Sequence, residues 1–599
     1  MKKLASWQKM PNSIDLIRQR ISDRHTGDQK QLDVIFSPSH RLLIEAPAGY
    51  GKTKTMVSRI AYMLATQQIP YPKKLLALTF SVNAAYKIKK DIKQQIPELL
   101  QGTDFKVDLN EKVFVANYHK FCWDVLRKQG YILHKSLLSI EDFETTDDAS
   151  VQKLAGLHID YKEAIFLVEY NKAVNEKNKQ FIIDNINKYC DIVIRKLLPE
   201  KVITYNSLIT LTIKLFRDYQ SIKDFYNNYY VAIITDEYQD TNLLDYWLIN
   251  LLVIEKTKTI FLGDPLQRIY DFIGAVPDLF EMSEKRFGLT KIALETNHRF
   301  KSNPQMLQLD ENIRKNAVNP SSPAISKPTQ IDFTLHANQD NEAQAVLQRA
   351  ISLLNENPDS KIAILVKQKK GNHNLDKILN LFDSQKVPYF YGLFTDQDSL
   401  YTKFHKNCLI EFKKIIEGKG HLTKKMGAEH LVEIKRIYSK PEPLSEAIIK
   451  LLDIFWIKFF SENAFLDNSE KISFVKETFE HNGLKQYIEF VQTSIIFSTV
   501  HAAKGLEWDY VILPDMEQGL FPNKWGLCKK CSYKKDCSIN IEPQNEKGFL
   551  EELNVFYVAV TRARKQVYFY ASASQIIDSD ENTVLCNLSC LLKLPGIII

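Results

Sequence analysis

Short apolar runs recur along the chain, and several of them are followed by Gly, Asp or Thr. Each run is predicted to be a fully buried strand. They cover residues 42–44, 75–78, 231–234, 259–262, 362–366, 495–499, 511–513 and 567–570. Helix-like stretches separate them, and continuous apolar strands that alternate with helices are typical of parallel sheets covered on both faces. The chain is therefore predicted to be an α/β protein with one such sheet in each half.

Two regions depart from this alternation. Residues 119–228 and 398–490 alternate charged and aliphatic residues and contain few strand-like runs. We predict that each region is a mostly helical insertion into a sheet domain. The first sheet domain would comprise residues 1–118 and 229–292, and the second residues 293–397 and 491–599.

The composition narrows the class of protein. Of the 599 residues, 45% are hydrophobic and 25% are charged, which excludes a disordered or fibrous chain. No apolar run approaches the roughly 18 to 20 residues that span a membrane, and the N-terminus becomes polar before a secretory apolar core could form. We therefore expect a cytoplasmic protein without a membrane partner. The net charge of +7 permits a polyanionic ligand but does not require one.

A candidate phosphate loop follows the first apolar run. The residues from Ala46 to Thr53 fit the pattern GxxxxGK[ST], except that alanine holds the first position. Gly49 and Gly51 would let backbone amides face phosphates, Lys52 would reach the β and γ phosphates, and the Thr53 hydroxyl would bind Mg²⁺. The alternative is a glycine turn before a helix. The predicted nucleotide contacts here are Ala46, Ala48, Gly49, Tyr50, Gly51, Lys52, Thr53 and Lys54.

Two adjacent carboxylates, Asp236 and Glu237, follow the third apolar run. This position is the carboxyl edge of the predicted sheet, where open α/β sheets bind their ligands. Asp236 suits the coordination shell of Mg²⁺, and Glu237 could accept a proton from an attacking water. An exposed acidic loop is the alternative, but the phosphate loop upstream favours nucleotide hydrolysis.

Further motifs follow in one order along the chain. They begin at Thr79, Asn117, Gly263, Leu294, Thr499 and Val558 and read TFSVNAA, NYH, GDPLQRIY, LETNHR, TVHAAKGLE and VAVTRA. In this order they resemble the UvrD/Rep/PcrA-like superfamily 1 DNA helicases, which are ATP-driven motors that move 3′ to 5′ along single-stranded DNA. The resemblance runs from Gln31 to Tyr570 and implies two RecA-like parallel-sheet domains, each carrying a mostly helical insertion.

The resemblance also implies roles in nucleotide binding and hydrolysis. Gln31, fifteen positions before Ala46, corresponds to a glutamine that reads adenine, and Gln267 to one that senses the γ-phosphate. His298 stands where the family usually has a tyrosine, and Glu507 completes the nucleotide contacts. The implied catalytic set is Lys52, Asp236, Glu237, Gln267, Arg299 and Arg562.

The same resemblance implies contacts with DNA. Single-stranded DNA is bound without sequence preference by aromatic faces beside a cationic groove, and several aromatic residues fall within the matched motifs. For any one of these rings, ordinary core packing is the alternative. The implied DNA contacts are Phe80, Asn83, Tyr118, His119, Tyr270, Phe272 and His501.

A cysteine-rich loop at residues 524–545 follows the pattern C-x2-C-x5-C. Such a density of thiolates predicts a soft metal, either tetrahedral zinc or an iron–sulfur cluster. The spacing resembles the C-terminal part of the iron–sulfur staple in AddB-type helicase–nucleases. A flexible basic loop with unligated thiols is the alternative. The predicted ligands are Cys528, Cys531 and Cys537, with Cys590 or Cys586 as the fourth.

We therefore predict an ATP-dependent DNA helicase that uses ATP and Mg²⁺ and acts on single-stranded and forked DNA. The alternative is a DNA-bound ATP switch that recruits or remodels a partner without processive unwinding. The cellular pathway, and a nuclease or other protein partner, are left open. Gly392 and Thr499 are only 107 positions apart, so the second insertion is predicted to be shorter than is usual in the family.

Overall fold

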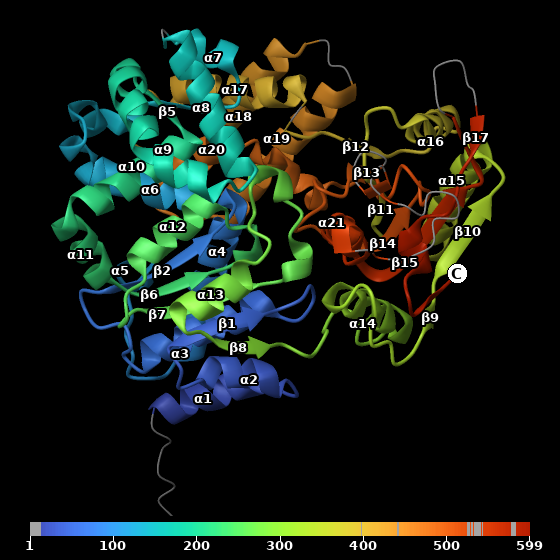
Figure 1. The fold of residues 1–599 in the computed structure, drawn as a ribbon, viewed down its shortest axis with the longest axis horizontal. Helices are drawn as coiled ribbons and strands as arrows, with labels where there is room; N and C mark the ends of the chain where they lie inside the picture. The colour runs from blue at the N-terminus through green and yellow to red at the C-terminus, as the bar shows by residue number, and fades with distance from the viewer. Residues whose placement is uncertain are drawn as a thin grey trace, which may run out of the picture. The chain divides into compact units, whose positions relative to one another are not determined.

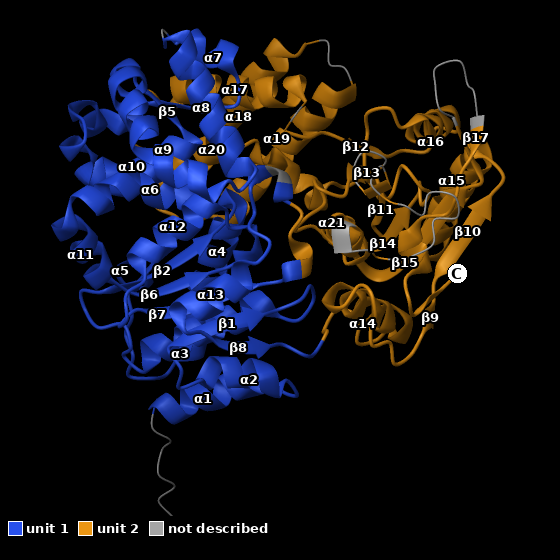
Figure 2. Ribbon diagram, in the orientation of Figure 1, with its two compact units in different colours: residues 1–265, 270–296 blue, residues 266–269, 297–599 orange. Residues whose placement is uncertain are grey.

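The computed structural model (Figure 1) describes residues 13–157, 159–396, 398–439, 443–523, 527–528, 531, 541, 543–576 and 583–599. The chain divides into two compact units, shown in Figure 2. Unit 1 comprises residues 1–265 and 270–296, and unit 2 comprises residues 266–269 and 297–599. Within the described parts of the chain, every helix is too short or too polar to cross a membrane.

A six-stranded parallel sheet in the order β3-β2-β6-β7-β1-β8 lies at the centre of unit 1. Its interior strands are four of the predicted apolar runs, whereas β3 and β8 at the edges were not predicted. The strands are β1 (Arg41–Glu45), β2 (Lys74–Thr79), β3 (Val113–Asn117), β6 (Tyr230–Thr235), β7 (Lys258–Gly263) and β8 (Thr290–Ala293).

Both faces of this sheet are buried, which explains why its interior strands are apolar without interruption. In β1, Leu42 and Ile44 pack into one hydrophobic cluster and Leu43 into the other. The first cluster includes residues of α1 (Ser13–Arg24), α2 (Gln29–Phe36), α3 (Lys52–Ala65) and α4 (Val82–Leu100). The second includes residues of α12 (Leu243–Leu252), α13 (Leu279–Phe287) and the first insertion.

The first insertion is mostly helical, as predicted. Its hydrophobic core is continuous with the second cluster on the sheet, so the structure groups the insertion and the sheet in one unit. A short parallel pair, β4 (Glu144–Thr146) and β5 (Val202–Thr204), is its only described sheet. Its main helices are α6 (Tyr118–Gln129), α8 (Tyr161–Asn175), α9 (Lys179–Ile192), α10 (Tyr205–Asp218) and α11 (Gln220–Tyr229).

Unit 2 contains a second six-stranded parallel sheet, in the order β10-β15-β14-β11-β13-β12. Its interior strands are again the predicted ones, so the prediction of an α/β fold with two parallel sheets is confirmed. The strands are β10 (Asp332–His336), β11 (Ile362–Val366), β12 (Phe390–Gly392), β13 (Ile495–Thr499), β14 (Trp508–Leu513) and β15 (Ala563–Ser572). The helices beside them are α14 (Pro304–Val318), α15 (Gln339–Glu356), α16 (His373–Ser384) and α21 (Pro543–Val560).

The second insertion is a small helical bundle with an aromatic core and two fully buried histidines, His405 and His430. Nε2 of His405 accepts a hydrogen bond from Leu484 N at 3.3 Å. Nδ1 of His430 accepts a hydrogen bond from Trp456 Nε1 at 3.2 Å. The other nitrogen of each lies within 2.9 Å of a backbone carbonyl oxygen. Its helices are α17 (Ser399–Ile416), α18 (Lys424–Ile437), α19 (Pro443–Glu462) and α20 (Asn468–Glu480).

Candidate nucleotide and DNA sites

The predicted phosphate loop joins β1 to α3. Gly49 and Gly51 have φ angles of +84° and +78°, in the left-handed region that strains residues with a Cβ. A Cβ at Gly51 would also lie only 2.5 Å from Gln31 Nε2. Helix α3 begins at Lys52 without a side-chain cap, so its first amides can face an anion.

Lys52 lies between the two predicted carboxylates. Its Nζ is 3.3 Å from Asp236 Oδ1 and pairs with Glu237 Oε1, and its side chain is only 12% exposed. Burial alone would lower the pKa of Lys52, but the two carboxylates outweigh burial and raise this pKa. One cation beside two anions leaves a net negative charge. Together with the hydroxyl of Thr53 in the same turn of α3, this donor set suits Mg²⁺.

Glu237 adopts a left-handed backbone, with φ +50°, which is uncommon for a residue other than glycine. Its Oε2 accepts a hydrogen bond from Gln239 Nε2 at 2.6 Å. Gln239 is buried, and its Oε1 accepts a bond from the backbone N of Asp264 at 3.0 Å. Gln239 thus ties the carboxylate to the loop after β7. Gln239 was not predicted as a site residue.

Gln31, the third residue of α2, lies beside the phosphate loop. Its side chain is buried, and its Nε2 donates to the backbone oxygen of Tyr50 at 2.9 Å. Its Oε1 contacts Nδ1 of His25, which was not predicted as a site residue. The Nζ of Lys54 donates to the backbone oxygen of Arg24 at 2.5 Å, so this side chain is engaged with the end of α1.

Unit 2 brings the predicted arginines together around Glu507. Arg299 pairs with Glu507 Oε1 and donates to the backbone oxygen of Thr561. Burial opposes ionisation of Glu507, but Arg299, Arg562 and Arg564 together lower the pKa of its carboxyl. This group therefore has one anion and three cations. His298, beside Arg299, is exposed.

Gln267 belongs to a four-residue segment, 266–269, that the structure groups with unit 2. Its Oε1 accepts a hydrogen bond from Arg562 Nη2 at 3.4 Å, and its backbone oxygen accepts one from Lys504 Nζ at 2.7 Å. Arg562 is 3% exposed and also donates from Nε to the backbone oxygen of Val558 at 2.9 Å. The predicted sensor glutamine and the predicted arginine are thus direct neighbours.

Two of the predicted DNA contacts lie together in unit 1. The rings of Phe80 and Tyr270 are stacked with centroids 5.2 Å apart, and both side chains are partly exposed. His119 is also partly exposed and packs edge-on against Tyr205 at 5.3 Å. Asn83 lies in the first turn of α4.

Tyr118 differs from this prediction. It is 2% exposed and belongs to the hydrophobic core, and its hydroxyl lies 3.3 Å from Thr241 Oγ1. Its ring therefore has no exposed face on which a base could stack, and Tyr118 leaves the set of candidate DNA contacts. The side chain of Phe272 lies outside the described residues.

His501 in unit 2 has cationic surroundings. Burial lowers the pKa of His501 to about 4, and Lys367, Lys504 and Lys485 lower it further by repulsion. The imidazole is therefore neutral at physiological pH. Lys367 and Lys485 are ion-paired with Glu552 and Asp396, and Lys504 donates to the backbone oxygen of Gln267.

The predicted cysteine ligands are only partly described. Cys537 lies outside the described residues, while Cys528 and Cys590 are both buried. Both thiols act electrostatically on the same ammonium group, that of Lys367. Among the residues whose placement is described, no three histidine, cysteine or acidic side chains are grouped so as to hold a metal ion.

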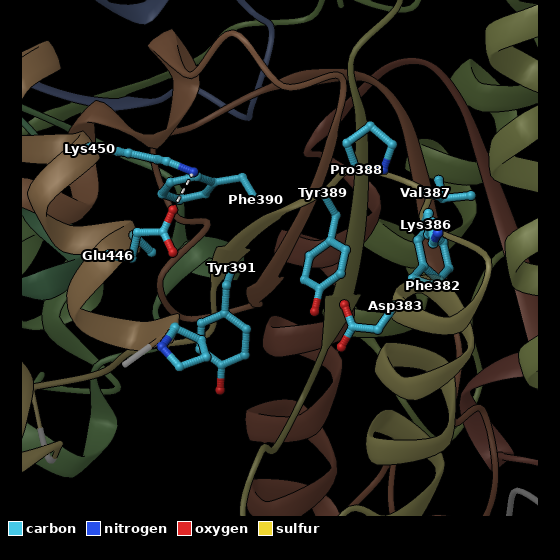
Figure 3. Close-up of a pocket in the computed structure, with 12 residues that line it drawn as sticks. Phe382, Asp383, Lys386, Val387, Pro388, Tyr389, Phe390, Tyr391, Glu446 and Lys450 are labelled. Atoms are coloured by element: carbon cyan, nitrogen blue, oxygen red, sulfur yellow. Dashed lines mark ion pairs between the residues drawn. The ribbon is translucent and has the colours of Figure 1, made fainter. Parts of the chain in front are cut away.

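A pocket of about 340 Å³ lies in unit 2 beside β12 and the start of α19 (Figure 3). The Tyr389 hydroxyl faces Asp383, and Glu446 pairs with Lys450 at 3.2 Å. The residues that line this pocket include none of the predicted site residues. It is therefore separate from the groups described above.

Comparisons with known proteins agree with the motif order. The model of the UvrD/REP helicase N-terminal domain matches residues 28–288, and that of the UvrD-like helicase C-terminal domain matches residues 454–574. A probable DNA helicase II homolog of Rickettsia conorii is 25% identical, covering 92% of this chain and 93% of the relative. The ATP-dependent DNA helicase PcrA of Staphylococcus aureus is 23% identical, covering 92% of this chain and 83% of the relative.

Proposed function

The chain belongs to the UvrD/REP family of ATP-dependent DNA helicases, and on this premise we propose that it moves 3′ to 5′ along single-stranded DNA and unwinds duplex at forks. The observation that carries this proposal is the contact of Arg562 with Gln267. A protein that only bound ATP and DNA would have no need for a buried arginine held against the predicted γ-phosphate sensor, so this contact supports ATP hydrolysis. We favour the motor over the ATP switch because the relatives named above are DNA helicases that match over most of their length.

Each group of the candidate nucleotide site has a proposed role. Lys52 binds the β and γ phosphates, and Glu237 accepts a proton from the attacking water. Asp236 and Thr53 hold Mg²⁺, which neutralises phosphate charge when bound. Arg299 and Arg562 stabilise the charge that develops on the transferring phosphoryl group. Residues 46, 48–51 and 54, with Gln31, His298 and Glu507, complete the proposed nucleotide contacts.

The stacked pair Phe80 and Tyr270 is the centre of the proposed DNA site. Stacking on an aromatic face contributes to binding of every base, which suits a motor that must tolerate any sequence. Asn83, His119 and His501 are proposed to contact the same strand. Phe272 also remains a proposed DNA contact, because it follows Tyr270 closely in the same motif.

ATPase and strand-displacement assays test the proposed function. Turnover should rise strongly with single-stranded DNA, and a duplex with a 3′ tail should be displaced while one with a 5′ tail is not. Stimulated turnover without displacement of either substrate would favour the switch. Absence of DNA-stimulated turnover in a folded protein would refute both.

The short second insertion leads to a finer proposal. In the family this insertion meets the duplex ahead of the motor, so a reduced form should leave stepping intact and weaken duplex engagement. We propose that a single copy translocates but unwinds long duplex poorly without a second copy or a partner such as a nuclease. Stopped-flow translocation and unwinding under single-turnover conditions test this, and processive unwinding by a demonstrated monomer would refute it.

We also propose that the cysteine loop binds zinc or an iron–sulfur cluster through Cys528, Cys531, Cys537 and Cys590. The common influence of Cys528 and Cys590 on Lys367 supports their proximity. Protein purified without oxygen should contain metal. Cys531→Ser should lower both the metal content and the stability of unit 2, because the free energy of metal binding stabilises the folded state. Metal content near zero, with the thiols freely alkylated, would refute the proposal.

A further inference from the structure

His25 occupies a buried corner between α1 and α2, beside the phosphate loop. It is 2% exposed, and both of its ring nitrogens have side-chain partners. Nδ1 contacts Gln31 Oε1, and Nε2 lies 2.9 Å from Ser58 Oγ. Ser58 is fully buried on α3, the helix that begins at Lys52. One imidazole thus joins the predicted adenine-reading glutamine to the helix of the phosphate loop.

The partners of His25 determine its tautomer. A side-chain amide oxygen can only accept a hydrogen bond, so Nδ1 must carry the proton that it donates to Gln31. Nε2 then accepts from the Ser58 hydroxyl. Burial lowers the pKa of His25 to about 4, with the charges of Lys54 and Arg24 acting in the same direction and Asp28 opposing them. The ring is therefore neutral at the pH of the cell.

This contact fixes the orientation of the Gln31 amide. Oε1 is held by His25 and Nε2 by the backbone oxygen of Tyr50. Turning the amide by 180° would place its NH₂ group against the Nδ1 proton and its oxygen against the Tyr50 oxygen. The contact with Tyr50 would then be repulsive, because a carbonyl oxygen can only accept, and the contact with His25 would require the ring to change tautomer and reverse its bond with Ser58. One order of acceptor and donor is therefore favoured in this corner.

The order of acceptor and donor decides which purine an amide can pair with. Adenine presents an N6 amino donor beside the N7 acceptor, and a glutamine amide pairs with both. Guanine presents two acceptors, O6 and N7, at the same edge. If the amide oxygen of Gln31 faces the 6-position of the base, it can accept a hydrogen bond from N6 of adenine. At guanine the same oxygen would face O6, which is also an acceptor, so no hydrogen bond could form.

We propose that His25 is a positioning residue that fixes the donor–acceptor order of Gln31 and thereby selects adenine over guanine nucleotides. The inference rests on the proposed function, in which Gln31 reads the base of ATP. It adds a second residue to base selection, one that does not touch the nucleotide itself.

The experiment compares kcat and KM for ATP and GTP in the presence of single-stranded DNA. In His25→Phe, which keeps the ring and removes both nitrogens, KM for ATP should rise about 10-fold, the scale of one unpaired buried acceptor. The values of kcat for both nucleotides and KM for GTP should stay within about twofold. Ser58→Ala should shift the ATP/GTP preference in the same direction by about threefold, and His25→Asn, which keeps one donor, should restore part of the preference.

His40→Phe is the matched control, because His40 is an exposed histidine of the same unit, and it should leave the preference unchanged. Equal losses for ATP and GTP in both His25→Phe and Ser58→Ala would overturn the inference. So would an intact preference in these variants when Gln31→Ala has lost it. Wild-type protein without any DNA-stimulated ATPase would instead refute the proposed function, which separates the two failures.

Discussion

The charged centre of unit 1 and that of unit 2 are built with opposite signs. In unit 1, the cation Lys52 lies between the carboxylates of Asp236 and Glu237. In unit 2, the anion Glu507 lies among Arg299, Arg562 and Arg564. The first centre has an excess of one negative charge and the second an excess of two positive charges.

This difference indicates what each centre must bind. Like charges held together in a partly buried place are costly unless a counter-charge is supplied. The excess negative charge of the acidic centre would attract a metal cation, and the excess positive charge of the arginine centre would attract phosphate oxygens. Both excess charges therefore support the proposal that these centres are binding sites rather than stabilising ion pairs.

The strongest test of the acidic centre is Glu237→Gln. This change keeps the size of the side chain and its bond to Gln239 but removes the group that accepts a proton, so turnover should fall by about 10⁴-fold. Lys52→Ala should also abolish turnover by removing the phosphate contact. Steady-state ATPase with a thermal unfolding curve checks both variants. Undiminished turnover in folded Glu237→Gln protein would show that this centre is not catalytic.

The arginine centre is tested by Arg562→Ala. Removal of one arginine that stabilises transition-state charge should lower turnover by about 10³-fold or more while nucleotide binding is retained. Equilibrium binding of a fluorescent ATP analogue, measured beside the ATPase rate, separates the two effects. A loss of only twofold would transfer the principal role to Arg299.

Gln267 should have a smaller effect than the arginine it contacts. Gln267→Ala removes one neutral hydrogen-bonding group, and we expect turnover to fall by about 10²-fold with KM for ATP little changed. The double variant Gln267→Ala/Arg562→Ala should lose less than the product of the two single losses, because neighbours act as a unit. Multiplicative losses would show that their contact has no functional coupling.

The smallest expected effect concerns Glu507 and pH. The pKa of Glu507 is lower in the folded protein than in the unfolded chain, where it is near 4.5. The ionised carboxylate therefore contributes its full stabilisation above about pH 4.5, and this stabilisation is lost as the pH falls through the folded pKa. Glu507→Gln should therefore lower Tm by about 2 °C at pH 7 and by less near pH 4. An equal shift in Tm at both pH values would contradict the electrostatic role.

The sequence predicts the interior of both sheets but not their edges. All eight interior strands are continuous apolar runs because helices cover both of their faces. The missed strands β3, β8, β10 and β12 are the four edges, and the burial of β8 and β10 is low along most of their length. An edge strand needs fewer apolar residues, so periodicity and hydrophobicity carry little signal for it.

The site shows a similar limit. Residues that would touch the nucleotide, such as Lys52 and Glu237, belong to motifs whose spacing follows from phosphate chemistry. Gln239 and His25 lie close in sequence to the side chains that they contact, Glu237 and Gln31, but their other partners, Asp264 and Ser58, lie much further along the chain. No motif spacing marks either residue. Tyr118 shows the reverse error, because a ring inside a DNA-facing motif can still point into the core.

The two buried histidines of the second insertion make its folding sensitive to acid. Burial lowers the pKa of both His405 and His430 to about 4, although Asp396 and Glu411 favour the charged form, and Lys485 adds to the lowering for His405. Both rings accept a hydrogen bond, so protonation would break it. The unfolded chain, with pKa values near 6.5, takes up two more protons than the folded insertion between about pH 6.5 and 4. Acidification through this range should therefore favour unfolding of the insertion, and His430→Gln should reduce the pH dependence of its stability measured by hydrogen exchange.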